Sequence, residues 1–187
     1  MLRVSIGSLL SAVVLFMWGF VFWMLSPVPK MMAKGVAYED ALASALKSHL
    51  HEDGHYFVPF GCEVMQGSDE EAKKAFAKKV EDGPVARIVF RTKGDTNMGA
   101  TMGIGFAHSL LCSLLAAGLL SMARIRTFAL RWAFVALLGV FASAVVTMCQ
   151  PIWFMASWKY SALYACFDIA GYALAAVPLA ALIAPKD

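Results

Sequence analysis

Four long apolar runs constrain the fold of this chain more than any other feature of its sequence. Together they hold only two charged residues, Arg3 and Asp168. Each run approaches the roughly 20 apolar residues that a helix needs to cross a bilayer. With 60% hydrophobic residues, the chain also carries more apolar surface than a soluble fold of 187 residues buries. The sequence therefore predicts a protein of the lipid bilayer, with four membrane spans. The runs are Met1–Leu25, Met98–Met122, Trp132–Gln150 and Tyr160–Ala184.

A polar segment, residues 26–97, separates the first run from the other three. Apolar periodicity predicts a helix over Tyr38–Leu50 and a second helix that begins with a capping box, Ser68 with Glu71. Aromatic and alternating patterns predict strands at Tyr56–Phe60 and Val85–Arg91. We expect an all-α membrane four-helix bundle with a helix-strand-helix-strand α/β insert. The expected domains are 1–25, 26–97 and 98–187, the last with helices at about 98–122, 132–150 and 159–184.

Charge and aromatic residues predict the orientation of the spans. The short basic loop Arg124–Arg131 is typical of a cytoplasmic connection, which places both termini in the cytoplasm and residues 26–97 in the periplasm of a bacterial inner membrane. Tryptophan and tyrosine rings gather near the predicted outer interface, where such rings settle. The first run lacks a small-residue cleavage site and is expected to remain as an anchor. The outer-interface residues are Trp18, Trp23, Trp153, Trp158 and Tyr160.

Small residues at helical spacing predict close packing between the spans. Gly99 and Gly103 open the second run, and Gly171 and Ala175 lie in the fourth. Such pairs let two helix backbones approach each other. The first run carries a similar set: Ser5, Gly7, Ser8 and Ser11.

Two ionisable residues lie inside the apolar runs, His108 and Asp168. Counted from the outer ends of their helices, both lie roughly 15 Å deep, so they can form an intramembrane polar pair. A carboxylate at that depth needs a partner, and Asp168 should face the bundle interior. One interpretation is a structural clamp to His108. The alternatives are a clamp to another side chain, a proton relay or ligand site, and an interface with a second subunit. The other clamp partners are Tyr164, Tyr172 and Thr147.

A histidine-rich turn offers a second candidate site. His49, His51 and His55, with Cys62 nearby, carry ligand types that suit zinc or copper. Their spacing matches no defined site, and histidines at the end of a helix are favourable without a metal. Surface histidines are therefore the competing interpretation, and no other cofactor is expected. In an oxidising periplasm, Cys62 is also a candidate disulfide partner of Cys149.

Motifs of common enzyme classes are missing from the sequence. It contains no hydrolase elbow, phosphate loop, CxxC, haem-attachment CxxCH or HExxH. The net charge of +3 comes from the flanks of the spans and calls for no nucleic-acid partner. An enzyme is therefore the minority interpretation.

Several short stretches together resemble an uncharacterised family of bacterial four-transmembrane-helix inner-membrane proteins. The resemblance implies the four-helix architecture, but it implies no activity because none is established for the family. The His49–His55 segment and Cys62 differ from the residues expected at these positions in the family. The stretches are Trp18–Pro27, Tyr38–Leu42, Gly54–Pro59, Gly83–Pro84, and the acid Asp168 followed by Gly171.

Abundant packing surface and little recognisable chemistry favour a non-enzymatic role. We expect an accessory or scaffold subunit that binds another membrane protein through its periplasmic domain and outer helix ends. One alternative is a small proton-coupled transporter or ion site that uses His108 and Asp168. The other is a periplasmic metal-binding protein that uses His49, His51 and His55.

Overall fold

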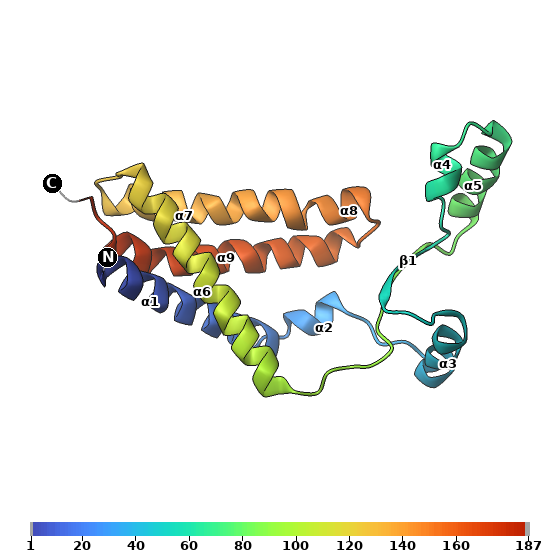
Figure 1. Cartoon of the computed structure of the whole chain (residues 1–187), viewed down its shortest axis with the longest axis horizontal. Coiled ribbons are helices and arrows are strands. Elements are labelled where there is room, and N and C mark those ends of the chain that lie inside the picture. The colour runs from blue at the N-terminus through green and yellow to red at the C-terminus, as the bar shows by residue number, and fades with distance from the viewer. Residues whose placement is uncertain (1, 186–187) are drawn as a thin grey trace. The chain divides into compact units, whose positions relative to one another are not determined.

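The computed structural model describes residues 2–185 and is mostly helical (Figure 1). The chain divides into two units. One comprises the residues up to Lys34 and from Thr96 onward, and the other comprises Gly35–Asp95. Each unit is described by itself.

The first unit holds four helices that are long and apolar enough to cross a membrane, as predicted. Asn97 caps α6 and Ser157 caps α9, because each side-chain oxygen accepts a backbone N–H of the first turn. A short helix, α2 (Val28–Met32), follows the first span. The four spans are α1 (Leu2–Phe20) with η1 (Val21–Leu25), α6 (Met98–Ala123), α7 (Phe128–Ala142) with η2 (Ser143–Thr147) and α8 (Cys149–Trp153), and α9 (Trp158–Leu182).

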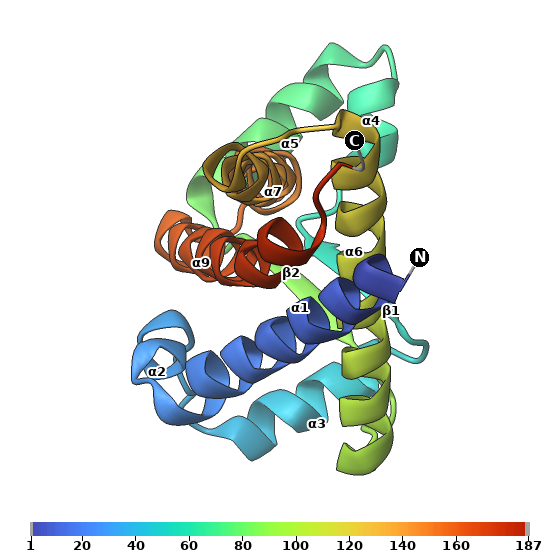
Figure 2. The same cartoon turned by 90° about the vertical axis from the view of Figure 1, so that its left-hand side faces the viewer.

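The four spans do not form an evenly packed bundle. Helices α7 and α9 lie side by side, and α1 packs along α9, whereas α6 runs obliquely across α1 (Figures 1 and 2). The buried core gathers where α6 and α9 end and α1 and α7 begin. Small side chains such as Ala117 and Ala176, both fully buried, let the helices approach there. The core residues are Ala116, Ala117, Leu120, Val135, Ala176, Leu179 and Ile183.

Small residues set the closest approaches to α9. At Gly171, an added Cβ would lie 2.9 Å from the Trp18 ring of α1, and the Ser11 hydroxyl donates to the Ala175 carbonyl at 3.0 Å. The prediction of close packing at Gly171 and Ala175 is confirmed. The prediction for Gly99 and Gly103 is wrong within the described residues. An added Cβ at Gly103 meets nothing within 4 Å, because the start of α6 diverges from the other helices.

A buried arginine ties the α6–α7 loop to the end of α9. The Arg131 side chain is only 7% exposed, and its Nε donates to the Ala180 carbonyl at 2.7 Å. Its Nη1 donates to the carbonyls of Ile125 and Arg126. Ala180 lies in the last turn of α9, where carbonyls lack partners within the helix. Arg131, predicted to end the basic loop, lies in α7 instead and caps the end of α9.

The Gly35–Asp95 unit follows the predicted helix-strand-helix-strand order, with one short helix added. Its strands form an antiparallel pair in which Tyr56 lies opposite Ile88. The predicted cap of the second helix is wrong by one residue, because the Asp69 carboxylate accepts the N–H groups of Glu71 and Ala72. The elements are α3 (Glu39–His49), β1 (Gly54–Val58), α4 (Cys62–Gln66), α5 (Glu70–Asp82) and β2 (Ala86–Phe90).

Two contacts organise this small unit. The Asp53 carboxylate accepts both the backbone N–H and the hydroxyl of Thr92, each at 2.8 Å, and so joins the ends of the strand pair. The Phe76 ring of α5 lies over Gly61, where an added Cβ would come within 2.2 Å of it. Even so, no residue in Gly35–Asp95 is fully buried. The unit lacks a closed hydrophobic core of its own.

Candidate functional site: a polar cavity among the long helices

A cavity of about 720 Å³ lies between α1, α6 and α9. Its walls are mainly apolar and aromatic, and a few polar side chains converge on it. This combination of size and lining is typical of a binding site. The polar lining residues are Thr101, His108, Ser109, Cys112, Tyr164, Asp168 and Tyr172.

The cavity exists because α6 leaves the other helices along its N-terminal half. The residues that α6 contributes to the cavity begin at Thr101 and end at Cys112, whereas its buried positions begin at Ser113. The same helix therefore packs tightly at one end and opens at the other. Phe16 of α1 lines the cavity and meets Phe106 of α6 edge-to-face, with 5.7 Å between ring centroids.

Asp168 is half-buried on α9 and is held by a neighbouring helix. The Thr147 hydroxyl donates to its Oδ2 at 2.8 Å. Thr147 ends η2, a single turn of π-helix within the third span. Such turns are frequent at functional sites because they displace the side chains that follow. The second carboxylate oxygen accepts no hydrogen bond from the described residues.

Aromatic contacts fix α9 immediately before Asp168. The indole Nε1 of Trp18 donates to the Phe167 carbonyl at 2.9 Å. The Phe167 ring stacks on Trp18 and lies 4.5 Å from the Phe22 ring, centroid to centroid. These contacts hold the backbone of Phe167, so the adjacent carboxylate has a defined position.

His108 and Cys112 form the opposite wall, on α6. They lie one turn apart, with 3.6 Å between the Cys112 Sγ and the His108 Nε2. His108 is exposed, so its ring is free to meet a ligand from the cavity. The structure places His108 and Asp168 on the same cavity, but no hydrogen bond or ion pair joins them among the described residues. Of the predicted clamp partners, Thr147 is the one that binds Asp168.

The residues of the predicted metal site are spread over several elements. His49 ends α3, His51 lies in the connection between α3 and β1, and His55 lies on β1 opposite Val89. Cys62 begins α4. Within residues 2–185, no three His, Cys, Asp or Glu side chains lie close enough to hold a metal ion together. A zinc or copper site here stays a prediction.

The four cysteines are free thiols. Cys62 belongs to the Gly35–Asp95 unit and Cys149 to the other unit, so their disulfide also stays a prediction.

Comparison of the chain with protein-family models, curated proteins and solved structures gave no match. The cavity must therefore be interpreted from its own geometry. Cys112 was not among the candidate residues predicted from the sequence, and Trp18 was predicted only at the membrane interface. Because His108 and Cys112 are four residues apart on one helix, the sequence could have predicted that their side chains lie side by side. Nothing in the sequence pointed to the contact between Trp18 and Phe167.

Proposed function

We propose that this protein is a non-enzymatic accessory subunit that binds a second membrane protein, and that a transmembrane helix of that partner fills the cavity beside Asp168. One observation carries the proposal. The N-terminal half of α6 leaves the other helices, and this exposes polar side chains on helices that are otherwise apolar enough to lie in lipid. His108 and Asp168 lie roughly 15 Å from the ends of their helices, near the middle of a bilayer. Exposed polar groups at that depth are costly without a partner.

The chemistry of Asp168 indicates what the partner helix carries. A carboxylate accepts several hydrogen bonds, and Thr147 supplies one of them. A lysine, arginine or amide side chain at mid-depth on the partner would supply the others. Such a contact offsets the cost of a carboxylate in hydrocarbon.

The Gly35–Asp95 unit supports the same proposal. It has no fully buried residue, yet it exposes large apolar side chains, among them Tyr38 at 88%, Phe60 at 66% and Val89 at 63%. A small unit without a closed core gains stability from a covering surface. We place this unit in the bacterial periplasm, and we place both termini in the cytoplasm beside the basic loop that contains Arg124 and Arg126.

Photo-crosslinking in native membranes tests the partner helix. A photoreactive residue replaces Met102, which lines the cavity, and in a matched protein it replaces Val146, which is exposed on η2 away from the cavity. We expect a discrete protein adduct from position 102 and lipid adducts alone from position 146. Lipid adducts alone from both positions would refute the proposal.

A small proton-coupled or ion-binding site is the second candidate function. The observation that favours it is the shared cavity of His108 and Asp168. In reconstituted vesicles, wild-type protein would then carry a pH-dependent flux that Asp168→Asn abolishes. Equal fluxes in the two proteins would exclude this role for Asp168.

A further inference from the structure

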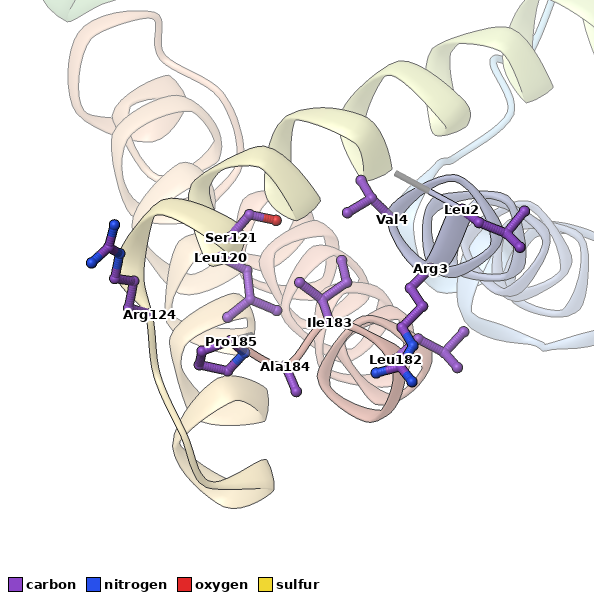
Figure 3. Close-up of a pocket in the computed structure, with 10 residues that line it drawn as sticks. All are labelled: Leu2, Arg3, Val4, Leu120, Ser121, Arg124, Leu182, Ile183, Ala184 and Pro185. Carbon is purple, nitrogen blue, oxygen red and sulfur yellow. The ribbon is translucent and has the colours of Figure 1, made fainter. Parts of the chain in front are cut away.

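A second cavity, of about 490 Å³, lies where α1 begins and where α6 and α9 end (Figure 3). The ends of membrane-spanning helices lie at the level of the lipid headgroups. Apolar side chains of α1, α6 and α9 form much of its wall, including Val4, Leu120 and Leu182. The cavity thus combines an apolar interior with a position at the membrane surface.

Two arginines from different helices border this cavity. Arg3 lies in the first turn of α1, and Arg124 follows the end of α6 in a left-handed conformation, with φ of 51°. Figure 3 shows them on opposite sides, with Leu120 and Ile183 between them. Neither forms an ion pair with a carboxylate among residues 2–185. Arg3 and Arg124 therefore place positive charge at the two sides of the cavity.

The helix ends around the cavity have opposing effects on an anion. The N-terminal end of α1 favours anions, whereas the C-terminal ends of α6 and α9 disfavour them. Arg131 offsets the effect of α9, because its Nε donates to the Ala180 carbonyl in the last turn. The remaining effects of α1 and α6 oppose each other, so the positive charge beside the apolar wall comes from Arg3 and Arg124.

We propose that this cavity binds an anionic phospholipid, with its negatively charged headgroup attracted by Arg3 and Arg124 at the two sides of the cavity and an acyl chain along Leu120 and Ile183. Guanidinium groups bind phosphate oxygens through charge-assisted hydrogen bonds. Basic pockets between membrane helices select anionic headgroups in the same way. This site lies at the opposite end of α6 from the His108 cavity and does not depend on the proposed function.

Native mass spectrometry of the purified full-length protein tests the proposal. Delipidated protein in detergent is mixed with phosphatidylglycerol or with phosphatidylcholine at equal concentration. We expect wild type to retain at least about fivefold more phosphatidylglycerol, because only that lipid carries a net negative charge. Equal retention of the two lipids would overturn the proposal.

Charge variants locate the site. The double variant R3Q/R124Q should lose the preference, whereas R126Q should keep it. Arg126 belongs to the same loop and is exposed, but it does not line the cavity. If R126Q lost the preference for phosphatidylglycerol to the same extent, the preference would depend on total charge, and the proposed site would be wrong.

Two further measurements separate a lipid from a soluble phosphate and guard against misfolded variants. Glycerol phosphate at millimolar concentration should not displace phosphatidylglycerol, and displacement would mean that the cavity recognises free phosphate instead. In wild type alone, phosphatidylglycerol should raise the unfolding temperature more than phosphatidylcholine does. Equal shifts would count against the proposal even if R3Q/R124Q failed to fold.

Discussion

The Thr147 hydroxyl donates a hydrogen bond to the Asp168 carboxylate over 2.8 Å and so joins the third and fourth spans at the cavity. The donor ends a turn of π-helix, and the acceptor follows the Phe167 carbonyl that Trp18 holds. Asp168 is therefore fixed from two sides, by η2 and by α1. The fold therefore fixes the direction from which the carboxylate can accept further hydrogen bonds.

Thr147→Val removes this hydrogen bond while keeping the shape of the side chain. We expect the free energy of unfolding to fall by about 1 kcal/mol, in the range of interhelical hydrogen bonds in membrane proteins. Thr147→Ser keeps the hydroxyl and should stay closer to wild type. Unfolding by sodium dodecyl sulfate in mixed micelles measures both. Equal stability of Thr147→Val and wild type would show that the bond contributes nothing.

Gly139→Ala should disrupt the crossing of α7 and α9. The added Cβ would lie 2.3 Å from the Tyr172 Cβ, so one helix must move. Overpacking of this kind costs about 1–3 kcal/mol. The same unfolding experiment checks it, with Gly118→Ala as the control. Gly118 has nothing within 4 Å of an added Cβ, and its replacement should leave stability unchanged or slightly raised.

Arg131→Met should weaken the end of α9. Methionine preserves much of the side-chain length but leaves the Ala180 carbonyl without the Arg131 donor. An unsatisfied buried group costs about 1–3 kcal/mol. Arg126→Met removes an equal charge from an exposed position and should cost far less. Similar losses in the two variants would mean that net charge, and not the carbonyl contacts, decides stability.

The pKa of Asp53 should respond to Thr92. The Thr92 backbone N–H, and then its hydroxyl, hold the pKa of this carboxyl below its ordinary value of 3.8. A lowered folded-state pKa means that the contact stabilises the strand pair above about pH 3.8. That contribution is lost as the pH falls through the folded-state pKa.

Carboxyl NMR of the full-length protein measures this directly. The Asp53 titration midpoint should lie below 3.8 in wild type. It should rise in Thr92→Ala, which keeps the backbone donor, without reaching the ordinary value. An unchanged midpoint in Thr92→Ala would show that the hydroxyl does not contribute.

Hydrophobic run length was enough to predict the four long helices, and local patterns were enough to predict the strands of the polar unit. These features depend on residues close in sequence. The Ser68 cap was placed one residue early because Ser68 and Asp69 are both good caps, and only the backbone geometry selects between them.

The approach of one helix to another was harder to predict. The spacing of Gly99 and Gly103 shows that another helix could pack closely against α6. It does not show that one of the other helices in the chain does so. Gly139 lies among large apolar residues, and nothing local marks its contact with Tyr172. The inward turn of Arg131 likewise depends on the end of α9, which is 49 residues away in sequence.

If a partner helix binds Asp168, the yield of the Met102 crosslink should depend on this carboxylate. The yield of the protein adduct is compared in wild type, Asp168→Asn and Glu81→Gln, the last of which removes an exposed carboxylate of α5 outside the cavity. We predict a loss of at least about fivefold in Asp168→Asn alone, because the neutral amide replaces the charged acceptor of the partner's hydrogen bond. An unchanged yield in Asp168→Asn, or an equal loss in Glu81→Gln, would show that the Asp168 carboxylate does not bind the partner helix.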